Sequence, residues 1–121
     1  MLETTLTQAL EDILDYIAHI ERFVAPLDEA QFRHDDRTVF AVQYALAGIG
    51  AVAMRLGEWA AILSPDVPWP QIRSLERQLR PGRGPIDPAA LWRTAHELSP
   101  LQFSAMLALT QLEDHERLEW L

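Results

Sequence analysis

Cysteine and lysine are both missing from this sequence, and each absence narrows the possible chemistry. The chain contains no cysteine, which excludes disulfides, thiolate metal sites and a cysteine nucleophile. It also contains no lysine, because its ten basic residues are all arginine, the better bidentate partner for carboxylate or phosphate. With 121 residues and 49% hydrophobic content, the chain is long enough for one domain with its own core. We therefore expect a single domain over residues 1–121.

Segments typical of secreted or membrane proteins are scarce as well. The first residues, MLETTLTQ, lack the basic and apolar regions of a signal peptide, which predicts a cytoplasmic protein. The longest apolar stretch, VFAVQYALAGIGAVAM at residues 39–54, has sixteen residues and is interrupted by Gln43. A membrane span needs about 20 residues. We therefore favour a closely packed central helix over a transmembrane helix, and we expect no membrane contact.

Acidic and basic residues are unevenly distributed along the chain. The formal net charge of −8 argues against non-specific binding to nucleic acid or to anionic membranes. Residues 1–29 hold seven acidic residues against one arginine, for a net charge of −6. Residues 71–93 hold five arginines against two acidic residues, for a net charge of +3. The second stretch is a locally basic segment in an acidic protein.

Hydrophobic periodicity predicts helices, and no stretch convincingly predicts a strand. Apolar residues spaced alternately by four and three predict an amphipathic first helix. They are Leu6, Leu10, Ile13, Ile17, Ile20 and Val24. Thr5 and Gln8 have the spacing of a capping box at its start, and Pro26 ends it. Residues 26–32 could form a short extra turn.

A long second helix is expected from Asp36 to Leu63, ending before Ser64-Pro65. Its middle is apolar all round and rich in alanine and glycine. Gly48 and Gly50 each cost about 1 kcal/mol of helix propensity. Close packing against neighbouring helices must offset that cost.

A third helix is expected to begin near Pro70. The stripe predicted to be buried consists of Ile72, Leu75 and Leu79. Arg73, Arg77 and Arg80 fall on a different face and are expected to point outward. The helix then meets Pro-Gly-Arg-Gly-Pro at residues 81–85, which neither a helix nor a strand can accommodate.

Two further helices complete the predicted fold. Asp87-Pro88 begins the fourth helix, and Ser99, with Gln102 at capping-box spacing, begins the fifth. Short loops between successive helices favour antiparallel neighbours. We therefore expect an all-α protein, an antiparallel up-and-down bundle of four to five helices.

A search for catalytic or metal-binding patterns finds little. The histidines are His19, His34, His96 and His115. No two of them have the i, i+4 spacing of a helical metal site, so we expect neither metal nor cofactor. The sequence also lacks a phosphate-binding glycine fingerprint and a nucleophile elbow. The tryptophans, expected in the core or at a subunit interface, are Trp59, Trp69, Trp92 and Trp120.

The stretch SPDVPWPQIRSLERQLRPGRGPIDPAALWRTAHELSPL resembles the HepT-like branch of the HEPN superfamily. The features that carry the resemblance are the Pro-x-Val-Pro-Trp segment at 65–69, Ile72, the Ile-Asp and Leu-Trp pairs within 86–92, and the acidic/Leu-Pro step at 97–100. The long second helix also resembles that of the family. The likeness covers roughly residues 6–110.

This resemblance implies an all-α bundle, a homodimer and a partner of the minimal-nucleotidyltransferase type that acts as antitoxin. It also implies a ribonuclease motif of arginine, four residues, histidine, one residue and tyrosine at the end of the third helix. Here Glu76 occupies the arginine position, Pro81 the histidine position and Arg83 the tyrosine position. Arg77 replaces an asparagine of the family, and Ala51 replaces a glutamate that often follows its glycine.

These departures remove the groups that RNA cleavage needs. Proton transfer at the 2′-hydroxyl needs a group that titrates near neutral pH, which histidine supplies and Pro81 cannot. Glu76 would repel the charge that develops on the phosphate, whereas a cation would stabilise it. Tyr16 and Tyr44, which lie on helices predicted to be packed, offer no replacement for the motif tyrosine. We therefore predict no catalytic residues and a protein inactive as a ribonuclease.

The leading hypothesis is a dimeric binding or regulatory module that still engages a nucleotidyltransferase, a nucleotide or RNA. Arg73, Arg77, Arg80 and Arg83 are its candidate anion- or partner-binding residues, because guanidinium groups bind carboxylates and phosphates through paired hydrogen bonds. The same arginines could instead form an ordinary solvated helix face. Two other hypotheses are an enzyme with a remodelled nucleotide- or RNA-processing site and a pure oligomeric scaffold.

Overall fold

The computed structural model describes the backbone of residues 2–80 and 86–119, and the side chains of residues 5–80 and 86–114. Within these ranges the chain forms helices and no strand. The helices are α1 (Leu2–Val24), α2 (Glu29–Arg33), α3 (Asp36–Leu56), α4 (Trp59–Leu63), α5 (Trp69–Gln78), α6 (Pro88–Ala95) and α7 (Ser99–Glu119). The predicted all-α class is confirmed.

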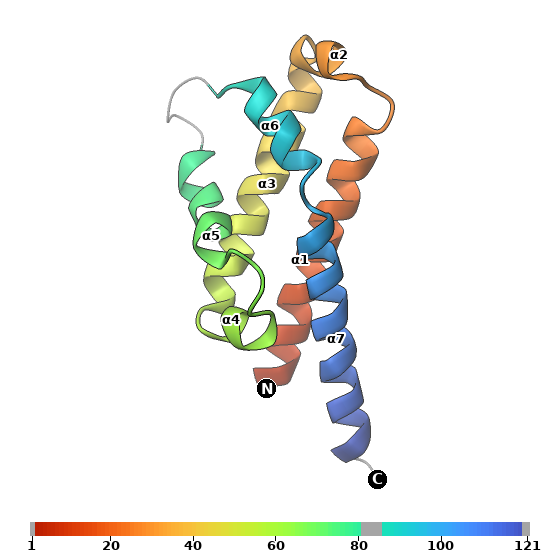
Figure 1. Ribbon diagram of the computed structural model, residues 1–121, viewed down its shortest axis with the longest axis vertical. Coiled ribbons are helices and arrows are strands. Elements are labelled where there is room, and N and C mark those ends of the chain that lie inside the picture. The colour runs from red at the N-terminus through yellow and green to blue at the C-terminus, as the bar shows by residue number, and fades with distance from the viewer. Residues whose placement is uncertain (1, 81–85, 120–121) are drawn as a thin grey trace.

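The longer helices α1, α3, α5 and α7 alternate in direction and form an elongated bundle (Figure 1). Helix α3 lies at the centre and packs against both α1 and α5, while α7 packs against α1. The short helices α2 and α6 contact each other at one end of the bundle, and α4 lies at the other end. The predicted up-and-down bundle is therefore confirmed. The short turn expected over residues 26–32 corresponds to α2, and α4 is an additional short helix.

The inward stripes of α1 and α3 form the centre of the core, and α2, α5, α6 and α7 add further buried residues. All six apolar residues predicted for the first helix are buried. On α3, Val42, Leu46 and Ile49 are completely buried. Burying such side chains stabilises a fold by about 1.5–3 kcal/mol each, so this shared interface holds the bundle together.

Two glycines of α3 allow its neighbours to approach closely, as predicted. A Cβ atom at Gly50 would lie 2.5 Å from the backbone nitrogen of Glu76 and 2.9 Å from the carbonyl oxygen of Ile72. A Cβ atom at Gly48 would lie 2.4 Å from the ring of Tyr16. The first contact sets the position of α5 against α3, and the second sets that of α1.

The boundaries of two helices differ from the prediction. Helix α1 begins at Leu2, so Thr5 lies inside the helix and is not its N-cap. The helix predicted over Asp36–Leu63 is interrupted at Gly57, whose φ of 56° places it in the left-handed region. Only glycine adopts this conformation without strain. The chain therefore turns there and starts α4 as a separate helix.

Aromatic residues fasten the ends of the bundle. The indole nitrogen of buried Trp69 donates a 2.9 Å hydrogen bond to the carbonyl oxygen of Ser64, which ties α5 to the preceding loop. The rings of Phe32 and Trp92 lie 5.3 Å apart and join α2 to α6. Trp59 is 40% exposed. Trp120 lies outside the described residues.

Helix α3 is also the one helix among the described residues that is long and apolar enough to cross a membrane. Its most apolar window is 44% buried within the bundle. The apolar composition of α3 is thus explained in part by its central position, where it packs against several other helices.

Candidate functional site

The described arginines of the basic segment surround one hollow on the surface beside α5. The hollow has a volume of about 350 Å³. It is lined by Met54, Pro70, Arg73, Ser74, Glu76, Arg77 and Arg80. We call it the arginine hollow. Three of the four candidate residues are therefore brought together, and the fourth, Arg83, lies outside the described residues, as does Pro81.

Helix α5 supplies most of the hollow, and α3 supplies one wall. Arginines spaced by four and three residues lie on one side of a helix. Because Gly50 has no side chain, the backbone of α5 at Glu76 can lie directly against α3. The side chain of Met54, on α3, is 56% exposed and forms an apolar wall beside the arginines.

The prediction that the arginines point outward agrees with the exposure of Arg77 and Arg80 and is wrong for Arg73. Arg73 is half-buried, and one of its terminal nitrogens donates a 3.4 Å hydrogen bond to the carbonyl oxygen of Gly57. Its Nε is buried without a hydrogen-bond partner among the described residues. The left-handed turn at Gly57, which the sequence analysis did not foresee, exposes the carbonyl that draws Arg73 inward.

Glu76 and Arg80 form an ion pair with several hydrogen bonds. Nη2 of Arg80 donates to Oε2 at 2.8 Å and to Oε1 at 2.9 Å, and Nε donates to Oε1 at 3.2 Å. These hydrogen bonds lower the pKa of Glu76 below its ordinary value and raise that of Arg80. The carboxylate that occupies the arginine position of the family motif is thus bound to Arg80, one helical turn further along the chain.

Arg77 is the cation of the hollow that keeps its donors available. It is exposed and makes no hydrogen bond or ion pair with the described residues. Because Arg80 is paired with Glu76 and Arg73 is turned toward Gly57, the free positive charge of the hollow is concentrated on Arg77. Such an arrangement can hold a carboxylate or a phosphate through a planar pair of N–H donors.

No imidazole lies among the described residues that line the arginine hollow. His19, on α1, contacts Arg22. His34 caps the C-terminal end of α2, and the ring of His96 lies tilted against that of Trp92, with a centroid distance of 4.2 Å and an interplanar angle of 42°. The side chain of His115 lies outside the described residues. The described lining can bind an anion, but it holds no group that transfers protons near neutral pH.

The described part of the chain also holds no group of three or more metal-binding side chains from histidine, cysteine, aspartate or glutamate. Zinc sites in proteins use three or four such ligands. The chemistry that the arginine hollow offers is therefore anion recognition by guanidinium groups.

An exposed stripe of α3 borders the hollow and was missed by sequence reasoning. Phe40 is 67% exposed and Tyr44 is 74% exposed, so the expectation that Tyr44 is packed is wrong. Ala51 and Met54 continue the stripe on the side opposite the core. The signal was present in the sequence, since a helix that is apolar all round needs a partner on every side.

With this geometry established, comparison with known proteins identifies the family. A family model described as "Ribonuclease HepT-like" matches residues 13–103. The chain belongs to this HepT-like family. A protein of Thermococcus cleftensis (strain DSM 27260 / KACC 17922 / CL1), named "Probable ribonuclease HepT", is 32% identical over 91 residues. The aligned region covers 75% of this chain and 83% of that protein.

No solved structure matches the chain significantly. The resemblance seen in the sequence is nonetheless confirmed by the family match. In this HepT-like chain, the matched range extends from α1 to the start of α7. It contains both the arginine hollow and the exposed stripe of α3.

Proposed function

We propose that this HepT-like protein has lost the ribonuclease activity for which its family is named and acts as a dimeric binding or regulatory module in the cytoplasm. The observation that carries the proposal is the ion pair of Glu76 with Arg80 at the position expected for the catalytic motif. The Glu76 carboxylate repels phosphate. It also forms an ion pair with Arg80, the neighbouring cation that could have replaced the missing arginine.

The second support is the composition of the hollow. Cleavage through the 2′-hydroxyl needs a proton acceptor and a proton donor. The described lining contains arginine, one carboxylate, one hydroxyl, proline and methionine, and no imidazole. This set can recognise a phosphate or a carboxylate, but it does not supply the proton transfers.

The occupant proposed for the exposed stripe of α3 is a second copy of this chain. Phe40, Tyr44, Ala51 and Met54 share one side of α3 and are left uncovered by the other described helices. Contiguous apolar surface of this kind marks an interface, and a two-fold contact lets one stripe cover its twin. Because Met54 also lines the arginine hollow, such a dimer holds the two hollows next to its interface.

The proposed partner of the hollow is a minimal nucleotidyltransferase, which the family resemblance implies. The unpaired guanidinium group of Arg77 can donate two parallel N–H hydrogen bonds to a carboxylate on that protein, or to a phosphate of its nucleotide or of RNA. An acidic partner also fits the locally basic α5 of an otherwise acidic chain.

The activity is tested by restoring the motif. We expect the parent protein not to cleave single-stranded RNA without metal, and the triple variant Glu76→Arg, Pro81→His, Arg83→Tyr to gain cleavage. A matched triple variant with alanine at the three positions controls for changes in folding. Cleavage by the parent protein that survives in the alanine variant but disappears in Arg77→Ala would overturn the proposal in favour of a remodelled enzyme.

The dimer is tested by light scattering at tens of micromolar protein. We expect a dimer, and we expect Tyr44→Glu to yield monomers, because it places a charge in the middle of the apolar stripe. Phe103→Glu on α7 is the matched control, since Phe103 is also a large apolar residue, 69% exposed, on a different helix. A monomeric parent protein, or dissociation by the control alone, would contradict this interface.

A further inference from the structure

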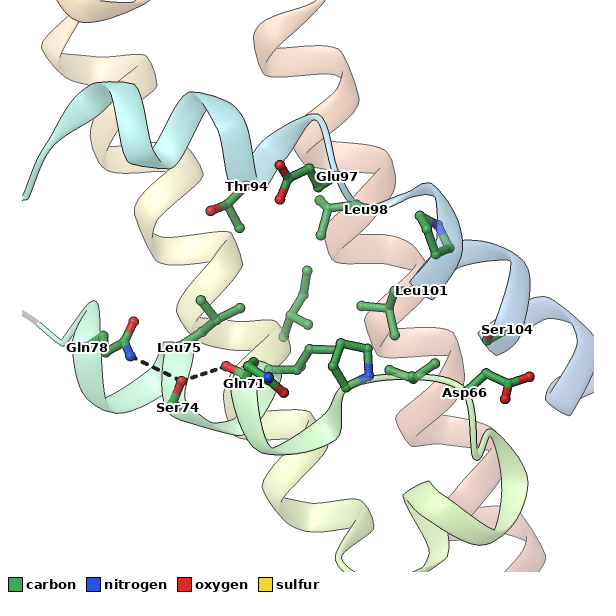
Figure 2. Close-up of a pocket in the computed structure, with 15 residues that line it drawn as sticks. Asp66, Gln71, Ser74, Leu75, Gln78, Thr94, Glu97, Leu98, Leu101 and Ser104 are labelled. Atoms are coloured by element: carbon green, nitrogen blue, oxygen red, sulfur yellow. Dashed lines mark hydrogen bonds between the residues drawn. The ribbon is translucent and has the colours of Figure 1, made fainter.

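A second hollow, with a mainly apolar lining, lies on the other side of α5, between α5 and α7. It has a volume of about 520 Å³, within the range of small-molecule sites. Ile49 of α3, Leu75 of α5 and Leu101 of α7 contribute to its lining (Figure 2). We call it the α5–α7 cavity.

The interior of this cavity is aliphatic. Ile49 is completely buried, and Leu98 and Leu101 are nearly so. Val67 and Leu75 add branched side chains from the loop before α5 and from α5 itself. No aromatic ring is found among the described residues that line the cavity. The lining therefore favours a flexible methylene chain over a planar ring that needs a stacking partner.

Carboxylates stand at two sides of the rim. Figure 2 shows Glu97, just after α6, and Asp66, in the loop before α5, on opposite sides of the cavity. Neither side chain makes a hydrogen bond or ion pair with the described residues. None of the described lining residues is basic. Both carboxylates are thus free to bind cations, and an anionic ligand is disfavoured.

The remaining polar groups suit a ligand with nitrogen along its length. The hydroxyl of Ser74 donates to the carbonyl oxygen of Gln71 at 2.6 Å and accepts from the amide of Gln78 at 3.2 Å. The side-chain amide of Gln71 has no partner among the described residues. Its carbonyl oxygen can accept a hydrogen bond from an ammonium group part-way along a chain.

From this arrangement we infer that the α5–α7 cavity binds a linear aliphatic diamine or polyamine. The methylene chain lies on Leu75, Leu98 and Leu101, and the terminal ammonium groups bind the carboxylates of Glu97 and Asp66. The site shares only Ser74 with the described lining of the arginine hollow, which lies across α5 and attracts the opposite charge. It therefore does not depend on the proposed loss of ribonuclease activity.

Calorimetry with spermidine and with diaminooctane tests this inference on the full chain. We expect both amines to bind, and octylamine, which has one ammonium group, to bind at least severalfold more weakly. Glu97→Gln and Asp66→Asn should each weaken diamine binding by about three- to tenfold, since exposed charge pairs contribute modestly. Octylamine should still bind to each variant, because its one ammonium group can pair with the carboxylate that was not substituted. Gln71→Arg, an exposed substitution that adds a cation at the rim, should weaken it further.

Non-specific attraction of amines to an acidic protein is measured with Glu11→Gln, an exposed change on α1 outside the cavity. Diamine binding should be unchanged in this variant. Circular dichroism of each variant reports whether the fold is kept. Absence of diamine binding at millimolar concentration, equal binding of octylamine, or equal weakening by Glu11→Gln would each overturn the inference.

Discussion

Helix α5 separates two hollows of opposite charge. On one side, Arg73, Arg77 and Arg80 line the arginine hollow, where Arg77 keeps its donors free. On the other side, Asp66 and Glu97 stand at the rim of the α5–α7 cavity, with no basic residue among its described lining. A ten-residue helix thus divides cationic from anionic surface, which the overall net charge of −8 does not reveal.

The two hollows also differ in how they are enclosed. The arginine hollow is bounded by α5, by Arg80 just after it and by one residue of α3, Met54, which also belongs to the exposed α3 stripe. The α5–α7 cavity is lined by α3, α5, α6, α7 and the segments before α5 and after α6. The first geometry suits a macromolecular partner, and the second suits a small flexible ligand.

The strongest perturbation of both sites together is a substitution at Gly50, because this residue sets the distance between α5 and α3. In Gly50→Ala, the new Cβ would lie 2.5 Å from a backbone nitrogen of α5, and backbone cannot move aside as a flexible side chain can. We expect a loss of about 1–3 kcal/mol in the free energy of unfolding, measured by urea denaturation. Anion binding and diamine binding should weaken together.

Ala18→Ser is the matched control for this substitution. Ala18 is an exposed residue of α1 outside both hollows and the α3 stripe, so the change should shift the free energy of unfolding by no more than about 0.5 kcal/mol. If Gly50→Ala were as stable as the parent protein and kept both binding activities, the idea that one contact positions both hollows would be wrong.

The buried stripe of α1 and the close packing at α3 could be predicted from the sequence, because each depends on a few neighbouring residues. The periodicity of α1 identified its buried stripe, and the two glycines of α3 indicated the approach of neighbouring helices. Gly57 could have been read as a helix end, but the apolar residues beyond it continued the helical pattern. Because the pattern continued, α4 was not predicted as a separate helix.

The features that were missed depend on contacts between distant segments. Periodicity indicates that Tyr44 lies opposite Leu46 on an apolar helix, but it does not indicate which side the other helices leave uncovered. Arg73 turns inward because a carbonyl sixteen residues away, at Gly57, accepts its hydrogen bond. The α5–α7 cavity is likewise formed by segments from α3 to α7, so no local sequence motif predicts it.

A more selective test separates the two hollows by reversing charge in one of them. In the double variant Arg77→Glu, Arg80→Glu, binding of pyrophosphate or of a short single-stranded RNA should fall by about tenfold or more, because charge-assisted hydrogen bonds are each worth roughly 1.5–3 kcal/mol. Fluorescence anisotropy or calorimetry measures this loss. Diamine binding in the α5–α7 cavity should be unchanged or slightly tighter.

Arg93→Glu is the matched control, since Arg93 is exposed and belongs to the same basic stretch of sequence but lies outside the arginine hollow. Equal loss of anion binding in this control would show that the hollow adds nothing to the general charge of the segment. No change in the double variant would leave the arginines as a solvated helix face.

The smallest expected effect concerns the protonation of Glu76. Hydrogen bonds from Arg80 hold its pKa below the ordinary value of 4.5, and the pair lies at the surface, where its contribution to stability is small. A pKa that is lower in the folded state means that this contribution is present at neutral pH. It is lost as the pH falls through the folded-state pKa of Glu76.

An NMR titration of the Glu76 carboxyl group measures this pKa directly. Arg80→Gln should move it upward toward the ordinary value, and added salt should move the parent value in the same direction. Arg93→Gln, which removes a charge outside the hollow, should leave it unchanged. A parent pKa at or above 4.5 would mean that Glu76 and Arg80 are not paired in solution. Arg80 would then be a second free cation beside Arg77, and the arginine hollow would bind anions more tightly than Arg77 alone allows.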